Sequence, residues 1–173
     1  MFPVVVKPVE EGSSIGLTVV KKEEDLGAAI LFASSYSKKI LVEKYIEGEE
    51  LTVGVLGDAA LAVVQIIPKK GYYNFEAKYT SGMTEYIVPA KIDPEQYKKA
   101  QFLGLKAHNA LGCRDMSRVD IRLDKEGIPW VLEVNTIPGF TQTSLLPKSA
   151  NAIGIGFEDL CEKILLLAVS RRG

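Results

Sequence analysis

The chain has 173 residues, and its 21 Lys and Arg against 22 Asp and Glu leave a formal net charge of −1. This balance argues against a sequence-independent nucleic-acid binder, which needs a basic surplus. No uninterrupted apolar run is longer than Ile164–Val169, which is too short to span a bilayer. A single histidine, His108, excludes a multi-histidine metal site and disfavours a Ser-His-Asp mechanism. We therefore expect neither nucleic acid nor membrane as a partner, and a cytoplasmic location in which Cys113 and Cys161 stay reduced.

The first part of the chain combines short β-branched runs with one helical segment. Runs rich in Val and Ile indicate strands, whereas Leu26, Ala29 and Ala33 recur at the spacing of one helix face. Gly57-Asp58 lies between two strand-like runs and predicts a tight hairpin turn. The predicted strands are 2–6, 17–20, 40–45, 51–56 and 60–67, and the predicted helix is 22–35.

An irregular stretch, Pro68–Tyr86, follows these strands. It contains four tyrosines and has no sustained hydrophobic period. A stretch of this length without regular structure inside a compact domain is typical of a functional loop.

The last part of the chain contains three predicted helices and two strands. Asp93 and Pro94 form a helix start, because Asp caps the first turn and Pro fits the first helical position, and Gly112 ends this helix after Leu111. Two strands, 119–123 and 130–135, flank a turn at Gly127, and helices follow at 146–152 and 157–170. This order of strands and helices predicts an α+β fold.

Four polar residues on the last two strands form the first candidate site. Side chains two positions apart in a strand point the same way, so Arg118 aligns with Asp120 and Glu133 with Asn135. If the strands pair across the Gly127 turn, all four meet on one face. Two carboxylates and an amide oxygen suit Mg²⁺ holding nucleotide phosphates, and an arginine suits developing negative charge. The alternative is a solvated strand face with a salt bridge.

The second candidate combines Lys7 with the loop Glu10–Gly16. A lysine at a strand end, followed by Gly-Ser-Ser-x-Gly, can hold phosphates through backbone N–H groups, hydroxyls and one charge. The lysine precedes the glycines, so this is not a Walker loop. A plain hairpin turn between two strands is the alternative.

Two further candidates are weaker on their own. The strand end Glu43–Ile46 can offer backbone atoms to an adenine edge, with Glu50 accepting from ribose hydroxyls, although a charged edge strand has the same pattern. Lys78 on the long loop can close over phosphates, although it can equally be a surface cation near tyrosines.

The remaining reactive side chains favour structural roles. His108 lies late in a predicted amphipathic helix, and we expect a partly buried surface histidine there rather than a catalyst. Cys113 follows the helix stop and Cys161 lies near the apolar stripe of the last helix, so both are expected to be packing residues.

The candidate segments occur in one order along nearly the whole chain. They are Val6-Lys7-Pro8 with Glu11-Gly12-Ser13-Ser14-Ile15-Gly16, Val42-Glu43-Lys44-Tyr45-Ile46 with Glu49-Glu50-Leu51-Thr52-Val53, Phe75-Glu76-Ala77-Lys78-Tyr79, Ser117-Arg118-Val119-Asp120, and Leu132-Glu133-Val134-Asn135-Thr136-Ile137-Pro138-Gly139-Phe140-Thr141 with Ser144-Leu145. Each segment alone is a weak signal, but together they resemble the ATP-grasp ligases, and most closely the D-alanine–D-alanine ligase family.

This resemblance implies an ATP site. Lys7 would contact the α- and β-phosphates beneath the loop of Ser13 and Ser14, and Lys78 would bind the transferred phosphate. The residues implied around the adenine are Glu43, Lys44 and, through its backbone, Ile46, while Glu50 would bind the ribose.

The resemblance also implies a metal and substrate site. Asp120, Glu133 and Asn135 would hold two Mg²⁺ ions, for which Mn²⁺ can substitute. Arg118 and the Gly139 amide would form an oxyanion hole, and Ser144 and Leu145 would bind the carboxylate of the second substrate. Tyr79 would form a hydrogen bond with Ser13 that holds the lid loop closed.

The implied reaction is ATP-dependent ligation of two D-alanines through a D-alanyl phosphate, for peptidoglycan precursors. It requires no protein nucleophile, so the lack of a catalytic triad is no obstacle. Tyr79 favours an amine acceptor, and ligation to another acceptor such as D-lactate is the alternative.

Family members are longer, with an N-terminal domain and an upstream ATP-contacting lysine that this sequence does not contain. We therefore expect an incomplete ATP-grasp fold: residues 1–50 as part of the central, small subdomain, and 51–173 as the carboxy-terminal, mixed-sheet subdomain with a mobile loop at 68–86. The intact parent is expected to be a homodimer, with the missing domain in cis or in trans. An inactive Mg-ATP-binding fragment is the alternative to an active ligase.

Overall fold

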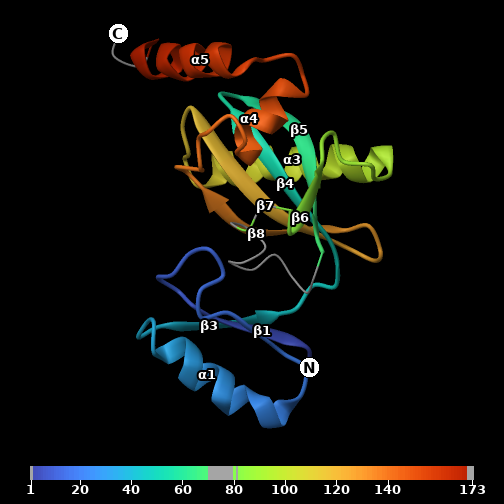
Figure 1. Cartoon of the computed structure of the whole chain (residues 1–173), viewed down its shortest axis with the longest axis vertical. Coiled ribbons are helices and arrows are strands. Elements are labelled where there is room, and N and C mark those ends of the chain that lie inside the picture. The colour runs from blue at the N-terminus through green and yellow to red at the C-terminus, as the bar shows by residue number, and fades with distance from the viewer. Residues whose placement is uncertain (1, 70–79, 81, 171–173) are drawn as a thin grey trace. The chain divides into compact units, whose positions relative to one another are not determined.

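The computed structural model describes residues 2–69, 80 and 82–170, and the chain divides into two compact units (Figure 1). Unit 1 comprises Met1–Ile46 and Pro68–Glu85, and unit 2 comprises Glu47–Ile67 and Tyr86–Gly173. Each unit has its own hydrophobic core.

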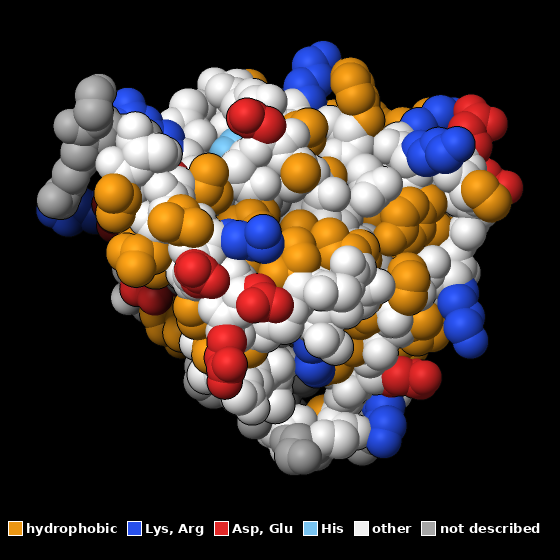
Figure 2. All heavy atoms as spheres, turned by 90° about the horizontal axis from the view of Figure 1, so that it is seen from above, with side chains coloured by type: hydrophobic (Ala, Val, Ile, Leu, Met, Phe, Trp, Pro, Cys, Tyr) orange, Lys and Arg blue, Asp and Glu red, His pale blue; other side chains and the backbone are white. Residues whose placement is uncertain are grey.

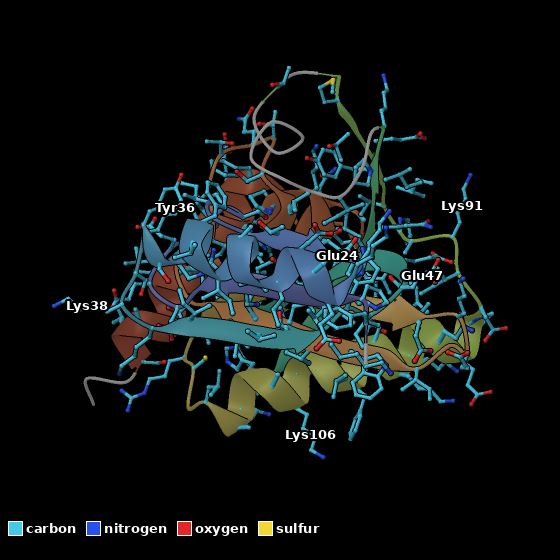
Figure 3. All side chains as sticks on the ribbon, turned by 90° about the horizontal axis from the view of Figure 1, so that it is seen from below. Glu24, Tyr36, Lys38, Glu47, Lys91 and Lys106 are labelled. Carbon is cyan, nitrogen blue, oxygen red and sulfur yellow. The ribbon has the colours of Figure 1, made fainter. Side chains whose placement is uncertain are left out.

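Unit 1 is a three-stranded antiparallel sheet covered by one helix. The sheet has the order β2-β1-β3, and its elements are β1 (Val4–Pro8), β2 (Thr18–Val20), the 3-10 turn η1 (Glu23–Asp25), α1 (Leu26–Ser34) and β3 (Ile40–Lys44). Val6 and Val20 pack with Ala29 and Ala33 of α1, because alternate strand residues and one helix face are apolar. In Figure 3, Glu24 and Tyr36 mark the opposite ends of α1.

Unit 2 is built on an antiparallel sheet with the order β6-β5-β4-β7-β8. The strands are β4 (Gly48–Leu56), β5 (Ala59–Pro68), β6 (Thr84–Ile87), β7 (Met116–Asp124) and β8 (Pro129–Asn135), and the helices are α3 (Pro94–Ala110), α4 (Leu145–Asn151) and α5 (Phe157–Ser170).

Helices cover both faces of the unit 2 sheet. On one face α3 approaches β4 so closely that a Cβ atom on Gly104 would lie 2.9 Å from the Cβ of Val53. On the opposite face α4 covers the next strand position, where a Cβ on Gly54 would lie 2.7 Å from Cδ1 of Leu146. Figure 1 shows the two helices on opposite sides of the sheet.

The apolar stripe predicted for α5 is confirmed by a second hydrophobic cluster. Leu160 is fully buried beside Leu146, and Ile164 and Leu167 pack against this cluster. The outer side of α5 also has apolar residues, which are Leu165, Leu166 and Val169. Figure 2 shows hydrophobic side chains interspersed with charged ones over the face on which α5 lies. None of the described helices is long and apolar enough to cross a membrane.

Most of the predicted elements are confirmed, and local signals explain why. At the start of α3, Asp93 accepts hydrogen bonds from the N–H groups of Glu95 and Gln96. At its end, Gly112 has a φ of 64°. Leu56 pairs with Ala59 across the predicted hairpin turn.

Four expectations are wrong. The strand pairs of unit 2 whose register is described are all antiparallel and not mixed, because short turns join β4 to β5 and β7 to β8. The stretch Pro68–Tyr86 contains the start of β6, which is too short to show a period and gains its stability from pairing with β5. Cys161 is exposed and does not pack in the core, because it lies beside the inward stripe of α5 and not on it. His108 is 2% exposed, because its side chain turns inward and its Nδ1 lies 2.7 Å from the Ser117 hydroxyl on β7.

Replacing Gly104 with Ala should lower the free energy of unfolding by about 1–3 kcal/mol, because the added methyl group has no room against Val53. The measurement is chemical denaturation monitored by circular dichroism. Lys106→Ala is the control, since Lys106 lies on the same helix and points into solvent (Figure 3). Equal effects of the two substitutions would contradict the close packing of α3 on β4.

Burial lowers the pKa of His108 below its ordinary value of 6.5, and the charges of Asp58 and Asp115 oppose this shift only in part. The unfolded chain therefore binds this proton more readily than the folded chain does. Stability contributed by neutral His108 is complete above pH 6.5 and declines as the pH falls below that value. Denaturation curves between pH 5 and 8 should show this decline in the wild type and a smaller one in His108→Gln; identical pH dependences would refute it.

Candidate functional site

The polar face of the unit 2 sheet carries the first candidate site. Strand register aligns β4, β7 and β8 in three rows, which are Glu50–Arg122–Trp130, Thr52–Asp120–Glu133 and Gly54–Arg118–Asn135. The expectation that Arg118, Asp120, Glu133 and Asn135 meet on one face is confirmed, because β7 and β8 do pair across the Gly127 turn.

A β-bulge adjusts this face. The register between β7 and β8 shifts between Asp120 and Ile121, so that Ile121 pairs with Val131 and Leu132 is the extra residue. Trp130 consequently lies opposite Arg122, one position away from where an unbroken ladder would place it. The alternation of polar and apolar residues in the sequence does not predict this shift.

Asp120 is held by two neighbours on this face. Arg118 donates from Nε to Oδ1 at 2.9 Å and from Nη2 to Oδ2 at 2.7 Å, which is the two-pronged geometry that arginine forms with carboxylates. Thr52 on β4 donates from its hydroxyl to Oδ1 at 2.7 Å. Both charged side chains are about five-sixths buried, at 16% and 15% exposure, so the pair is shielded from solvent.

A second ion pair lies one row away. Arg122 donates from Nη1 to Oε2 of Glu50 at 3.1 Å, and these two side chains are 13% and 16% exposed. Sequence reasoning named Glu50 but missed both Arg122 and Thr52. The sequence does indicate Arg122, because this residue lies two positions after Asp120 in the same strand and therefore on the same face of the sheet.

The segment that leaves β8 brings further candidates together. Asn135 accepts a hydrogen bond from the N–H of Ile137 at 3.1 Å, which turns the chain after the strand. Ser144 accepts from the N–H of Thr141 at 3.0 Å, and a Cβ on Gly139 would lie 3.4 Å from the Ser144 hydroxyl oxygen. Gly139 and Ser144 therefore lie side by side, immediately before α4 begins at Leu145.

In unit 1 the second candidate is also a charged pair beside a constrained loop. Lys7 Nζ lies 2.7 Å from Oε1 of Glu43, across β1 and β3. Ser13 and Ser14 have φ values of 52° and 62°, a left-handed conformation that costs free energy in residues other than glycine. The N–H of Ile15 donates to the Gly12 carbonyl at 3.0 Å, so the two serines are the central residues of a tight turn. This conformation is typical of hairpin turns, so the backbone path fits a plain hairpin turn as well as a phosphate-binding loop.

The other adenine candidates lie at the end of unit 1. Lys44 is the last residue of β3 and is exposed, whereas Ile46 is half-buried where unit 1 ends. Lys78 and Tyr79 lie outside the described residues, so their predicted roles stay predictions.

The donor set of Asp120, Glu133 and Asn135 suits a hard cation. In the described ranges, no group of three or more His, Cys, Asp and Glu is arranged to hold a metal ion. The predicted set is different, because it has two carboxylates and one amide oxygen from neighbouring strands. Oxygen donors of this kind are the ligands that Mg²⁺ prefers, and Asp120 and Glu133 are direct partners across the ladder.

Three comparisons with known proteins relate this geometry to a family. The family described as "D-ala D-ala ligase C-terminus" matches residues 1–166. A D-alanine--D-alanine ligase of Geotalea uraniireducens is 52% identical over 167 residues, covering 96% of this chain and 54% of the relative. A second, from Trichlorobacter lovleyi, is 49% identical over 173 residues, covering 99% of this chain and 55% of the relative.

Solved structures agree with the sequence relatives. The crystal structure of D-alanine--D-alanine ligase from Bacillus anthracis has a TM-score of 0.86 and 36% identity, covering 99% of this chain and 56% of that one. The VanG D-Ala:D-Ser ligase from Enterococcus faecalis has a TM-score of 0.85 and 35% identity, covering 96% and 50%. The α+β, ATP-grasp fold expected from the sequence is thereby confirmed.

The chain spans about half the length of the relatives that it matches. Within that span the family match covers nearly every residue, including the whole polar face of β4, β7 and β8. The chain therefore belongs to the D-alanine–D-alanine ligase family, of which it represents the carboxy-terminal part.

Proposed function

We propose that this chain supplies the nucleotide- and metal-binding part of an ATP-dependent ligase that joins two D-alanines for peptidoglycan precursors. The observation that carries the proposal is the arrangement of Arg118, Asp120, Glu133 and Asn135 on one sheet face, in a member of this ligase family. One of its structural relatives was solved as a complex with ATP, which supports ATP as the nucleotide.

The residues that the resemblance implies for the nucleotide bind Mg-ATP in this proposal. Lys7 and the backbone N–H groups around Ser13 and Ser14 bind the α- and β-phosphates, and Lys78 binds the transferred phosphate. The adenine is bound by Glu43, Lys44 and the Ile46 backbone, and the ribose by Glu50. The Lys7–Glu43 ion pair supports this assignment, because it holds a phosphate ligand and an adenine ligand next to each other.

The oxygen ligands Asp120, Glu133 and Asn135 are proposed to hold two Mg²⁺ ions, or Mn²⁺ in their place. Bound there, the ions neutralise the charge of the ATP phosphates. Asp120 is already oriented by Thr52 and Arg118, so its carboxylate does not have to be ordered when the nucleotide binds.

Two transfer steps follow in the proposed reaction. A carboxylate oxygen of the first D-alanine attacks the γ-phosphorus, and the bond to ADP breaks to give D-alanyl phosphate. The amine of the second D-alanine then attacks the acyl carbon, loses a proton, and phosphate leaves. Arg118 and the Gly139 amide stabilise the tetrahedral oxyanion, while Ser144 and Leu145 bind the carboxylate of the second D-alanine. Tyr79 forms a hydrogen bond with Ser13 that holds the lid loop closed.

Two alternatives are favoured by specific observations. Because the chain spans about half of its relatives, these residues alone can be an Mg-ATP-binding fragment that lacks turnover. Because one structural relative is a D-Ala:D-Ser ligase, the acceptor can differ from D-alanine, and D-lactate is a further choice. The proposal also includes a homodimeric parent, an N-terminal domain in cis or in trans, and a cytoplasmic location. It further includes the domain boundary at residue 50 and a mobile loop in the part of 68–86 that precedes β6.

The purified chain with ATP and Mg²⁺ should release ADP only when D-alanine is present, because the carboxylate of D-alanine is the proposed phosphoryl acceptor. The measurement is coupled ADP detection, with D-serine or D-lactate offered as the second substrate for comparison. Mg-dependent ATP binding without release would favour the binding fragment. A chain that neither binds ATP nor releases ADP would contradict both functions.

Asp120→Asn and Glu133→Gln should each weaken Mg²⁺-dependent ADP binding by at least about tenfold, because each removes an anionic oxygen ligand. Calorimetric titration of ADP with and without Mg²⁺ measures this effect. Glu126→Gln is the matched control, since it removes the same charge from the exposed turn between β7 and β8. Unchanged affinity in both site variants would refute the metal assignment.

A further inference from the structure

We propose that Thr52 is a positioning residue that fixes the Asp120 carboxylate so that Oδ2, and not Oδ1, is the atom offered to a metal ion. This inference deepens the proposed function, because it rests on the assignment of Asp120 as a metal ligand. Thr52 is not among the site residues predicted from the sequence. The pairing register of β4 and β7 places it opposite Asp120.

The hydroxyl of Thr52 is a buried and directed donor. Its residue is 1% exposed, so water does not compete for it. Its oxygen lies 2.7 Å from Oδ1 of Asp120 and 3.2 Å from the Val119 carbonyl oxygen. A hydroxyl has one proton, and the shorter contact to a charged acceptor is the stronger bond. The β-branched side chain has a restricted χ1, so the donor stays in place.

The contacts of Asp120 distinguish its two oxygens. Each carboxylate oxygen has about two acceptor positions. Oδ1 accepts from both Thr52 and the Nε of Arg118, which fills both positions. Oδ2 accepts only from Nη2 of Arg118 among the described residues, which leaves one lone pair for a further partner.

Loss of the Thr52 hydroxyl would remove this distinction. Oδ1 would then have an open acceptor position like that of Oδ2, and either oxygen could be offered to the metal ion. Residues that orient a metal ligand by hydrogen bonding typically contribute about 10–100-fold to metal affinity. The two hydrogen bonds from Arg118 would still hold the plane of the carboxylate. We therefore expect a loss of metal affinity at the lower end of that range.

The test is a titration with Mn²⁺ in the presence of ADP, in which electron paramagnetic resonance measures free and bound Mn²⁺. Thr52→Val keeps the shape of the side chain and should raise the Kd for Mn²⁺ about tenfold. Thr52→Ser keeps the hydroxyl and should stay within about twofold of the wild type. The spectrum of bound Mn²⁺ should broaden in Thr52→Val only, a change that general destabilisation does not produce.

Asp120→Asn separates this inference from the proposed function. If Asp120→Asn weakens Mn²⁺ binding and Thr52→Val does not, the role of Thr52 is refuted while the metal site stands. If Asp120→Asn has no effect, the metal assignment itself fails. The double variant should bind no more weakly than Asp120→Asn alone, because Thr52 acts only through that carboxylate. Should Thr52→Val not fold, Thr52→Ala makes the same comparison.

Discussion

The two-pronged ion pair between Arg118 and Asp120 is the contact on which the polar face of unit 2 depends. It places a guanidinium and a carboxylate side by side on one strand, largely shielded from water, where neither charge could stay without the other. The same pair unites the two proposed activities, metal binding by Asp120 and charge stabilisation by Arg118. Thr52 adds a third contact from the neighbouring strand, which makes the orientation of the carboxylate a property of the sheet.

The sheet can carry this face because β7 is strictly amphipathic. Val119 and Ile121 are fully buried in the core beneath α3, while Arg118, Asp120 and Arg122 alternate with them on the opposite side. The core side is packed tightly enough that Gly104 has no room for a methyl group against Val53. A rigid apolar layer thus supports the polar one, and ligand oxygens on a rigid strand are better placed than on a loop.

Unit 1 uses a different device for its candidate site. Two consecutive serines in left-handed conformation direct the loop after β1, and Lys7 is paired with Glu43 on the sheet next to it. Hairpin turns use the same backbone conformation, so the path of the loop alone does not select phosphate binding. Membership in the ligase family gives this geometry its proposed use, since the charges alone would also fit a structural ion pair.

The sequence by itself determined the helices, the hairpin at Gly57 and the shared face of Arg118, Asp120, Glu133 and Asn135, because helix caps, turn residues and two-residue alternation are local properties. Tertiary structure decided the rest. The contact of Thr52 with Asp120 joins residues 68 positions apart, and that of Glu50 with Arg122 joins residues 72 apart. Burial of His108, pairing of β6 and the bulge at Leu132 likewise depend on which strands become neighbours and in which register. Register is fixed by packing of the whole sheet, so no local pattern contains it.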